Sequence, residues 1–307
     1  MDVREKIDLL KREKRAIILA HYYTSPEVQQ VADFVGDSLA LSEKAAVADA
    51  DIILFAGVRF MAETAKVLSP SKKVLLPVVD AGCSLADSCD AAELARVKAE
   101  NPDHLVVSYV NTSVEVKALT DICCTSSNAL KIVESLPQDQ KILFVPDRNL
   151  GSYINRCTRR DMKLWDGACL VHEEFSAEKI RALKALHPEA VVLVHPECKA
   201  EVVALADYAG STAGILAYCS RPEVKEVIVV TESGILYEME SRYPDKKFYL
   251  VEPEKGCEKC VSCKDMKLVT LDNIYQTLLN ESPEVVIDEE VRAAAEGSIR
   301  RMLGIMV

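Results

Sequence analysis

The chain has 307 residues, with 48 acidic and 37 basic side chains and a formal net charge of -11. No basic stripe offsets this charge, which argues against a nucleic-acid partner or an anionic membrane surface. The segment MDVREKIDLLKREKRA predicts a charged amphipathic helix rather than a signal peptide, and no apolar run approaches the ~20 residues that a membrane span needs. We therefore expect a cytoplasmic protein without a membrane partner.

The first predicted strand, IILA, ends at His21. A short apolar run of this kind is typical of a buried parallel strand, and ligands bind at the carboxyl ends of such strands. A helix start follows at Asp37 and Ser38, because Asp and Ser are favoured N-cap residues. A second strand is predicted at 52–56, and a third, KVLLPV, leads to a loop that carries Cys83.

The second segment repeats these landmarks in the same order. The run LVVS ends at Tyr109, closely followed by Asn111, and a serine cluster at Ser126 marks the next helix start. A strand beginning at Ile142 and a loop that carries Cys169 come afterwards. The order of landmarks therefore indicates a repeated α/β unit rather than a chance resemblance between two strands.

The third segment completes the pattern, so that the strand ends recur at intervals of about 87 residues. The run VVLV ends at His195, Glu197 follows, and Ser211 and Thr212 start a helix. A strand with the sequence IVVTE then leads to a loop with three cysteines, Cys257, Cys260 and Cys263. We expect three compact α/β domains at 1–86, 87–173 and 174–267, with the C-terminal helices of 268–307 packing on the first.

Eleven cysteines in a chain without an export signal point to thiols or metal ligands rather than to a disulfide scaffold. Several have a plainer explanation, because free cysteine often serves as a small buried apolar residue. We assign that role to Cys89, Cys123, Cys124, Cys157, Cys198 and Cys219. Cys83 and Cys169 differ, since each follows a glycine-containing turn just beyond a strand.

If the ligand ends of the three sheets face a common centre, one cysteine from each unit converges there. Three thiolates suit an iron-sulfur cluster or zinc. The repeat spacing slightly favours Cys257 as the third cysteine, although the C-x-x-C-x-x-C pattern also fits a local zinc site or a redox pair. Helix starts at Ser38, Ser126, Ser211 and Thr212 offer N–H groups to phosphate or carboxylate, which predicts a multiply anionic small molecule as ligand.

Taken together, these motifs resemble the quinolinate synthase family over nearly the whole chain. The resemblance is carried by ILAHYY, ADFVGDSL, GVRFMAE, YVNTS with CTSSNA, PDRNLG, C-x-x-H at Cys169, VHPEC, AGSTAG and the D-M-K after Cys263. It implies three Rossmann-like three-layer α/β/α domains with parallel sheets, related by a pseudo-threefold axis, with the active site at the centre. It also implies an enzyme of de novo NAD biosynthesis that condenses iminoaspartate with dihydroxyacetone phosphate to quinolinate, phosphate and two waters.

The same resemblance implies site residues. Cys83, Cys169 and Cys263 would ligate one [4Fe-4S] cluster, whose fourth iron is open to act as a Lewis acid, and Cys257 and Cys260 would form a disulfide or redox pair. The implied catalytic residues are His21, Tyr23, Tyr109, His195 and Glu197. The implied substrate-binding residues are His21, Ser38, Tyr109, Val110, Asn111, Ser126, His195, Pro196, Glu197, Ser211 and Thr212. Iminoaspartate would come from an aspartate oxidase or dehydrogenase.

Two other interpretations stay open at this point. One is a zinc- or disulfide-stabilised α/β binding protein for an anionic metabolite, in which Cys83 and Cys169 are merely buried. The other is a different cluster-dependent dehydratase that acts on another hydroxy acid. The motifs G-x-G-x-x-G, G-x-x-x-x-G-K-[ST] and H-E-x-x-H do not occur in the sequence, so a dinucleotide site, a P-loop and a zincin site lack their usual signatures.

Overall fold

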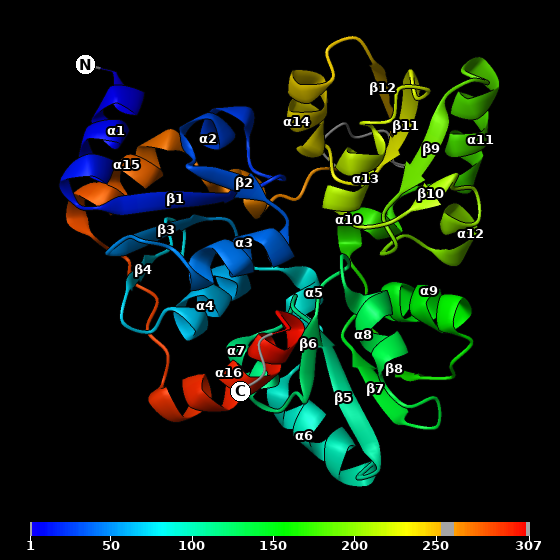
Figure 1. Cartoon of the computed structure of the whole chain (residues 1–307), viewed down its shortest axis with the longest axis horizontal. Helices are drawn as coiled ribbons and strands as arrows, with labels where there is room; N and C mark the ends of the chain where they lie inside the picture. Colours follow the sequence, from blue (N-terminus) through cyan, green and yellow to red (C-terminus); the bar gives the residue numbers. More distant parts are fainter. Residues whose placement is uncertain (1, 253–260, 305–307) are drawn as a thin grey trace.

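The computed structural model describes residues 2–252 and 261–304, which form three lobes around a common centre (Figure 1). Each lobe contains a four-stranded sheet in which all strands are parallel. In spatial order the sheets are β2 (Phe34–Gly36), β1 (Ala16–His21), β3 (Ile52–Ala56) and β4 (Lys73–Leu75); β6 (Ile122–Cys124), β5 (His104–Tyr109), β7 (Lys141–Val145) and β8 (Lys163–Leu164); and β10 (Tyr208–Ala209), β9 (Val191–Val194), β11 (Glu226–Val230) and β12 (Lys247–Leu250). The predicted α/β fold with three parallel sheets is confirmed.

Helices cover these sheets and connect their strands. The first lobe contains α2 (Pro26–Val31), α3 (Ser38–Ala46), α4 (Arg59–Leu68) and, at its N-terminal edge, α1 (Val3–Glu13). The chain continues through α5 (Ser84–Asp87), α6 (Ala91–Glu100), α7 (Val114–Ala118), α8 (Ala129–Ser135), α9 (Arg148–Thr158) and α10 (Leu170–Glu173). It ends with α11 (Ala177–Leu186), α12 (Ala200–Val203), α13 (Thr212–Tyr218), α14 (Ile235–Arg242), the 3-10 helix η2 (Met266–Leu268), α15 (Leu271–Asn280) and α16 (Glu289–Met302). None of the helices in the described ranges is both long and apolar enough to cross a membrane.

The predicted N-terminal amphipathic helix is α1. Asp2 caps it by accepting a hydrogen bond from the Glu5 N–H (2.9 Å), and the Glu5 side chain accepts one from the Asp2 N–H in return (2.8 Å). Ile7 and Leu10 are buried on its inner face, where α15 and the first sheet lie. The charged residues of the segment are left on the outer face, as the periodicity predicts.

Strands at the middle of each sheet are buried on both faces, which explains why their sequences are continuous apolar runs. In β1 and β3 successive side chains point to opposite faces of the sheet. Leu19 and Phe55 belong to one core cluster, while Ile18 and Leu54 belong to another on the opposite face. Helices are therefore needed on both sides of the sheet, and a three-layer unit results.

One aspartate in each unit joins the first strand of the sheet to its neighbour in the same way. Its carboxylate accepts the N–H of a residue in the central strand, and its own N–H donates to the carbonyl of that residue. The three pairs are Asp33 with Ile18 (2.7 Å), Asp121 with Val106 (2.8 Å) and Asp207 with Val192 (2.8 Å), measured to the carboxylate. This feature, which the sequence comparison of the segments overlooked, is a further sign of triplication.

The two C-terminal helices pack differently from one another. We expected both on the first unit, and α15 does lie against α1 and β3 there. In contrast, α16 lies along α7 and β6 of the second unit and also contacts α4 of the first (Figure 1). Its buried face includes Ala295, Ile299 and Met302, and the Ser298 hydroxyl donates to the Lys117 carbonyl (3.0 Å). The helix therefore closes the junction between two units.

Candidate active site

A cavity lies where the three units meet, and domain junctions are a common position for small-molecule sites. Several of its polar residues lie at the carboxyl ends of the strands β1, β5 and β9. The predicted residues in its walls are His21, Tyr23 and Ser38 from the first unit, Tyr109, Asn111 and Ser126 from the second, and His195, Glu197 and Thr212 from the third. The structure thus brings together the equivalent positions of the three repeats.

Three of the predicted binding residues do not line this cavity. Val110 and Pro196 are buried beside it, as direct chain neighbours of lining residues. Ser211 is the N-cap of α13, and its hydroxyl accepts a hydrogen bond from the Gly214 N–H (3.1 Å). The structure therefore does not place these three side chains in the cavity wall.

Cys83, Cys169 and Cys263 line the same cavity as free, partly exposed thiols. Cys83 and Cys169 each sit at the N-cap of a short helix, α5 and α10, and Cys263 lies in the turn before η2. Burial raises the pKa of Cys83 to about 12 and of Cys263 to about 11, and it also raises the pKa of Cys169. Thiols with raised pKa values become thiolates when a bound cation supplies compensating charge.

Most of the remaining cysteines are buried apolar residues, as predicted; these are Cys89, Cys123, Cys124, Cys198 and Cys219. Cys157 is the exception, because its side chain is exposed on α9. The buried residues of this helix are Leu150, Gly151 and Ile154, and Cys157 lies in its last turn. Cys257 and Cys260, with the predicted disulfide or redox pair, lie outside the described residues.

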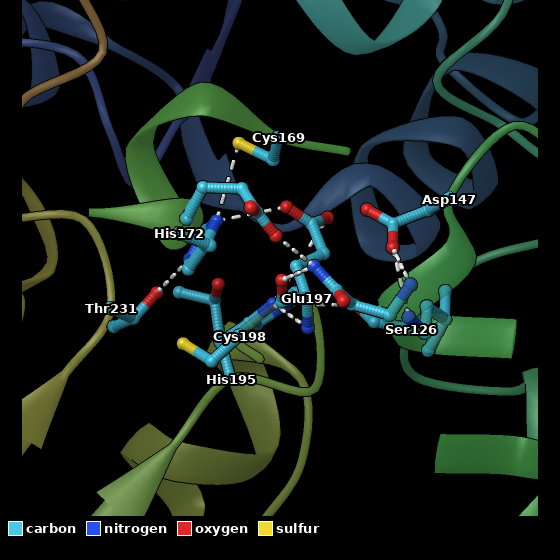
Figure 2. Close-up of polar contacts among 12 residues, drawn as sticks. Ser126, Asp147, Cys169, His172, His195, Glu197, Cys198 and Thr231 are labelled. Atoms are coloured by element: carbon cyan, nitrogen blue, oxygen red, sulfur yellow. Dashed lines mark hydrogen bonds and ion pairs between the residues drawn. The ribbon is translucent and has the colours of Figure 1, made fainter. Parts of the chain in front are cut away.

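The Glu197 carboxylate is the centre of a buried polar network. The Tyr109 hydroxyl donates to Oε1 (2.6 Å), and Nδ1 of His172 lies 2.9 Å from Oε2. The His172 ring stacks on His195 with 4.7 Å between ring centroids (Figure 2). Burial alone would raise the pKa of Glu197, but His172, His195 and the hydrogen bonds outweigh it, and the pKa is lowered. The carboxyl group is therefore ionised.

His172 is a site residue that sequence reasoning did not select. The signal was present in the C-x-x-H motif, because a spacing of three residues on α10 brings its Nδ1 to within 3.3 Å of the Cys169 Sγ. Its partner on the other side, Thr231, follows β11 and lies 3.0 Å from Nε2. Only the packing of the second unit on the third brings these groups together.

His21 and His195 have equivalent surroundings. Each Nδ1 accepts the backbone N–H two residues further on, from Tyr23 (3.1 Å) and Glu197 (3.3 Å) respectively. Burial is the largest cause that lowers the pKa of both to about 3, assisted by Lys267 at His21 and by His172 at His195. Both rings are therefore neutral near pH 7, with the proton on Nε2.

The Tyr23 hydroxyl reaches across to the third unit. It lies 2.7 Å from the Thr212 hydroxyl and 2.9 Å from the Thr231 hydroxyl. Burial, followed by the Glu197 charge, raises the pKa of Tyr23 well above its usual value, and the same causes act on Tyr109. Both tyrosines are thus protonated hydroxyl donors around one ionised carboxylate.

A hydrogen-bonded junction links the three units beside the cavity. The Ser127 hydroxyl lies 2.6 Å from Oδ2 of Asp37 and 2.8 Å from the Ser211 hydroxyl, so one residue from each unit takes part. Each is the direct chain neighbour of a predicted anion anchor: Ser38, Ser126 or Thr212. Ser38 and Thr212 are the first residues of α3 and α13, whereas Ser126 lies in the turn before α8. The junction therefore sets the spacing of the three anchors.

Glu232 and Lys267 fix the turn that carries Cys263. The Glu232 carboxylate is buried and accepts the N–H of Cys263 (3.0 Å), and the Lys267 ammonium lies 3.1 Å away from it. Lys267 also donates to the Tyr23 carbonyl. Neither residue was predicted as part of the site, although T-E-S-G after a strand and D-M-K after a cysteine were visible in the sequence.

Three α/β units with parallel sheets surround one cavity lined by neutral histidines, an ionised carboxylate and three thiols. These features define the molecule as an α/β enzyme with a candidate active site at the domain junction. Comparison with known proteins is specific. Residues 5–304 match the family model described as quinolinate synthetase A protein, and the chain belongs to this family.

Named relatives agree with this assignment. The quinolinate synthase of Trichormus variabilis is 52% identical over 303 residues, which are 99% of this chain and 93% of the relative. That of Nostoc punctiforme is 51% identical over 307 residues, covering 100% of this chain and 94% of the relative. The quinolinate synthase of Synechocystis is 51% identical over 302 residues, with 98% and 95% covered.

Proposed function

We propose that this chain condenses iminoaspartate with dihydroxyacetone phosphate to quinolinate, phosphate and two waters, in the de novo synthesis of NAD. The observation that carries the proposal is the cavity itself, in which one cysteine from each repeat lies beside the acid-base groups His21, His195 and Glu197. Membership of the quinolinate synthetase A family supports the same reaction. Iminoaspartate hydrolyses readily in water, so we expect functional coupling to an aspartate oxidase or dehydrogenase that supplies it.

Cys83, Cys169 and Cys263 are the proposed ligands of one [4Fe-4S] cluster. The donor set fits this group, because three free thiols line one cavity and burial disfavours their thiolate forms until a cation is bound. When bound, a cluster with three cysteine ligands supplies one open iron as a Lewis acid. The remaining chemistry belongs to side chains of the protein.

The substrates carry carboxylate and phosphate groups, and the three anchors Ser38, Ser126 and Thr212 offer hydroxyl groups to them. The N-terminus of α3, where Ser38 lies, adds backbone N–H groups and the positive end of a helix dipole. Oδ1 of Asn111 is buried in the wall without a hydrogen-bond partner among the described residues, and it is free to accept one from a substrate N–H or O–H. These groups would hold both substrates in one orientation.

Loss of phosphate and of two waters requires that protons are added to the leaving oxygens and that other protons are removed from carbon or nitrogen. His21 and His195 are neutral and carry a proton on Nε2, so each can donate a hydrogen bond to a leaving oxygen. The ionised Glu197 can accept a proton or stabilise a neighbouring positive charge, while Tyr23 and Tyr109 donate hydrogen bonds. We propose these five residues as the catalytic set.

The test is the iron and acid-labile sulfide content of anaerobically purified protein, followed by an assay of quinolinate formation. We expect about four irons per chain in the wild type. Cys83→Ala, Cys169→Ala and Cys263→Ala should each lose iron and activity, whereas Cys257→Ala and a substitution of the exposed Cys157, Cys157→Ala, should keep both. Zinc in place of iron, or iron that depends on Cys257 and not on Cys263, would contradict the proposal.

A further inference from the structure

Cys169, His172 and Glu197 form a compact group of potential metal ligands. Their Sγ, imidazole nitrogen and carboxylate oxygen all lie within 4.8 Å of one another. The His172 Nδ1 is 2.9 Å from the carboxylate and 3.3 Å from the Sγ. Zinc bonds of about 2.0–2.3 Å in a tetrahedral arrangement place neighbouring ligand atoms roughly 3.2–3.7 Å apart. The Nδ1–Sγ distance already falls in this range, and the Nδ1–carboxylate distance is a few tenths of an ångström short of it.

The hydrogen-bond partners of these ligands are also in place. The second nitrogen of His172 lies 3.0 Å from the Thr231 hydroxyl, and the other oxygen of Glu197 accepts a hydrogen bond from Tyr109 (2.6 Å). Figure 2 shows the His172 ring and the carboxylate facing each other, with Cys169 above them and Thr231 on the far side of the ring. Partners of this kind orient metal ligands and strengthen binding in known zinc sites.

Charge and burial favour a divalent cation of the zinc type. His172 and Glu197 are 2% and 4% exposed, so the carboxylate is desolvated, and the partly exposed Cys169 thiol adds a second negative charge when metal binding deprotonates it. A doubly charged cation neutralises both. Sulfur, nitrogen and oxygen donors together suit zinc better than calcium or magnesium, which prefer oxygen alone.

We propose that Cys169, His172 and Glu197 bind one Zn²⁺ when the chain carries no iron-sulfur cluster. A fourth ligand would come from the cavity, which all three residues line. Because Cys169 is also a proposed cluster ligand, zinc and cluster exclude one another at this residue. The zinc site itself does not depend on the proposed function.

The experiment is a titration of metal-free, fully reduced chain with Zn²⁺ in competition with a chromogenic chelator. All proteins carry Cys257→Ala and Cys260→Ala, so that these two cysteines do not bind the ion. We expect one Zn²⁺ per chain, with binding weakened at least about 10-fold by His172→Gln or Glu197→Gln and retained in Cys83→Ala and Cys263→Ala. Co²⁺ should give the visible absorption of a tetrahedral site with one thiolate ligand.

A second variant covers the case in which a ligand substitution prevents folding. Thr231→Val keeps the size of the side chain and removes only the hydroxyl beside His172, and it should weaken Zn²⁺ binding about 10-fold. Zinc binding that is lost in Cys83→Ala and Cys263→Ala but kept in His172→Gln would show a three-cysteine zinc site and overturn the proposal. The absence of stoichiometric zinc binding would overturn it as well. Neither result bears on quinolinate formation, which is measured with the iron-loaded enzyme.

Discussion

Replacing Tyr109 by phenylalanine tests whether the hydrogen bond from the Tyr109 hydroxyl stabilises the buried Glu197 carboxylate. The substitution removes one hydroxyl, which lies 2.6 Å from Oε1 of Glu197, and keeps the ring in the core. A hydrogen bond to a charged group contributes about 1.5–3 kcal/mol, and more is lost if the acceptor stays buried without a partner. We expect the free energy of unfolding to fall by about that amount near pH 7.

The same bond should matter in catalysis. If Glu197 stabilises positive charge or accepts a proton in the transition state, loss of about 1.5–3 kcal/mol slows quinolinate formation about 10- to 150-fold. The measurements are urea denaturation followed by circular dichroism and the initial rate of quinolinate formation, both under anaerobic conditions. Iron content, measured alongside, shows whether a loss of activity comes from a loss of cluster.

Tyr153→Phe is the matched control. Its hydroxyl donates to the carbonyl of Ala209 (3.2 Å), a neutral acceptor away from the cavity. Removal of a neutral hydrogen bond costs about 0.5–1.5 kcal/mol, and we expect full activity. If Tyr109→Phe is no less stable than Tyr153→Phe and is equally active, Glu197 is not held as a buried carboxylate in this way.

Three further predictions concern the surroundings of the cavity. Ser127→Ala removes the hydroxyl that joins the three units, so KM should rise about 3- to 10-fold with little change in kcat, whereas the exposed Ser135→Ala should leave both unchanged. Burial lowers the pKa of His21 and His195 to about 3, so between pH 6.5 and 3 the unfolded chain binds more protons than the folded one. Stability should therefore fall as the pH is lowered, by up to about 1.4 kcal/mol per pH unit for each histidine. In denaturation series at pH 7 and 5.5, His195→Gln should lose less stability between the two pH values than the wild type, and equal losses would contradict neutral burial. Lys267→Met leaves the buried Glu232 carboxylate without its ammonium partner beside the Cys263 turn. Stability should drop by about 1–3 kcal/mol, and a chelator should remove iron from the variant faster than from the wild type. Unchanged iron retention would show that the ion pair does not hold this turn.

Much of the fold could be predicted because its signals are local. In a parallel α/β unit the strand is a short apolar run, the helix start is a capping residue, and both recur with the repeat. Since all parallel strands end at one edge of their sheet, His21, Tyr109 and His195 had to occupy equivalent places. The three cavity-lining cysteines follow by the same logic, each after the last strand of its sheet.

Other features were decided only by how the units pack. His172 meets Glu197 across the second and third units, Ser127 joins all three, and α16 closes the junction of the first two. Cys157 lies three residues after the buried Ile154, on the same side of α9, yet it is exposed in the last turn of the helix. Each depends on contacts between residues far apart in the chain, whereas periodicity and capping describe only neighbours within a few residues. The sequence alone therefore determined which groups each repeat contributes, and the tertiary structure decided which of them touch.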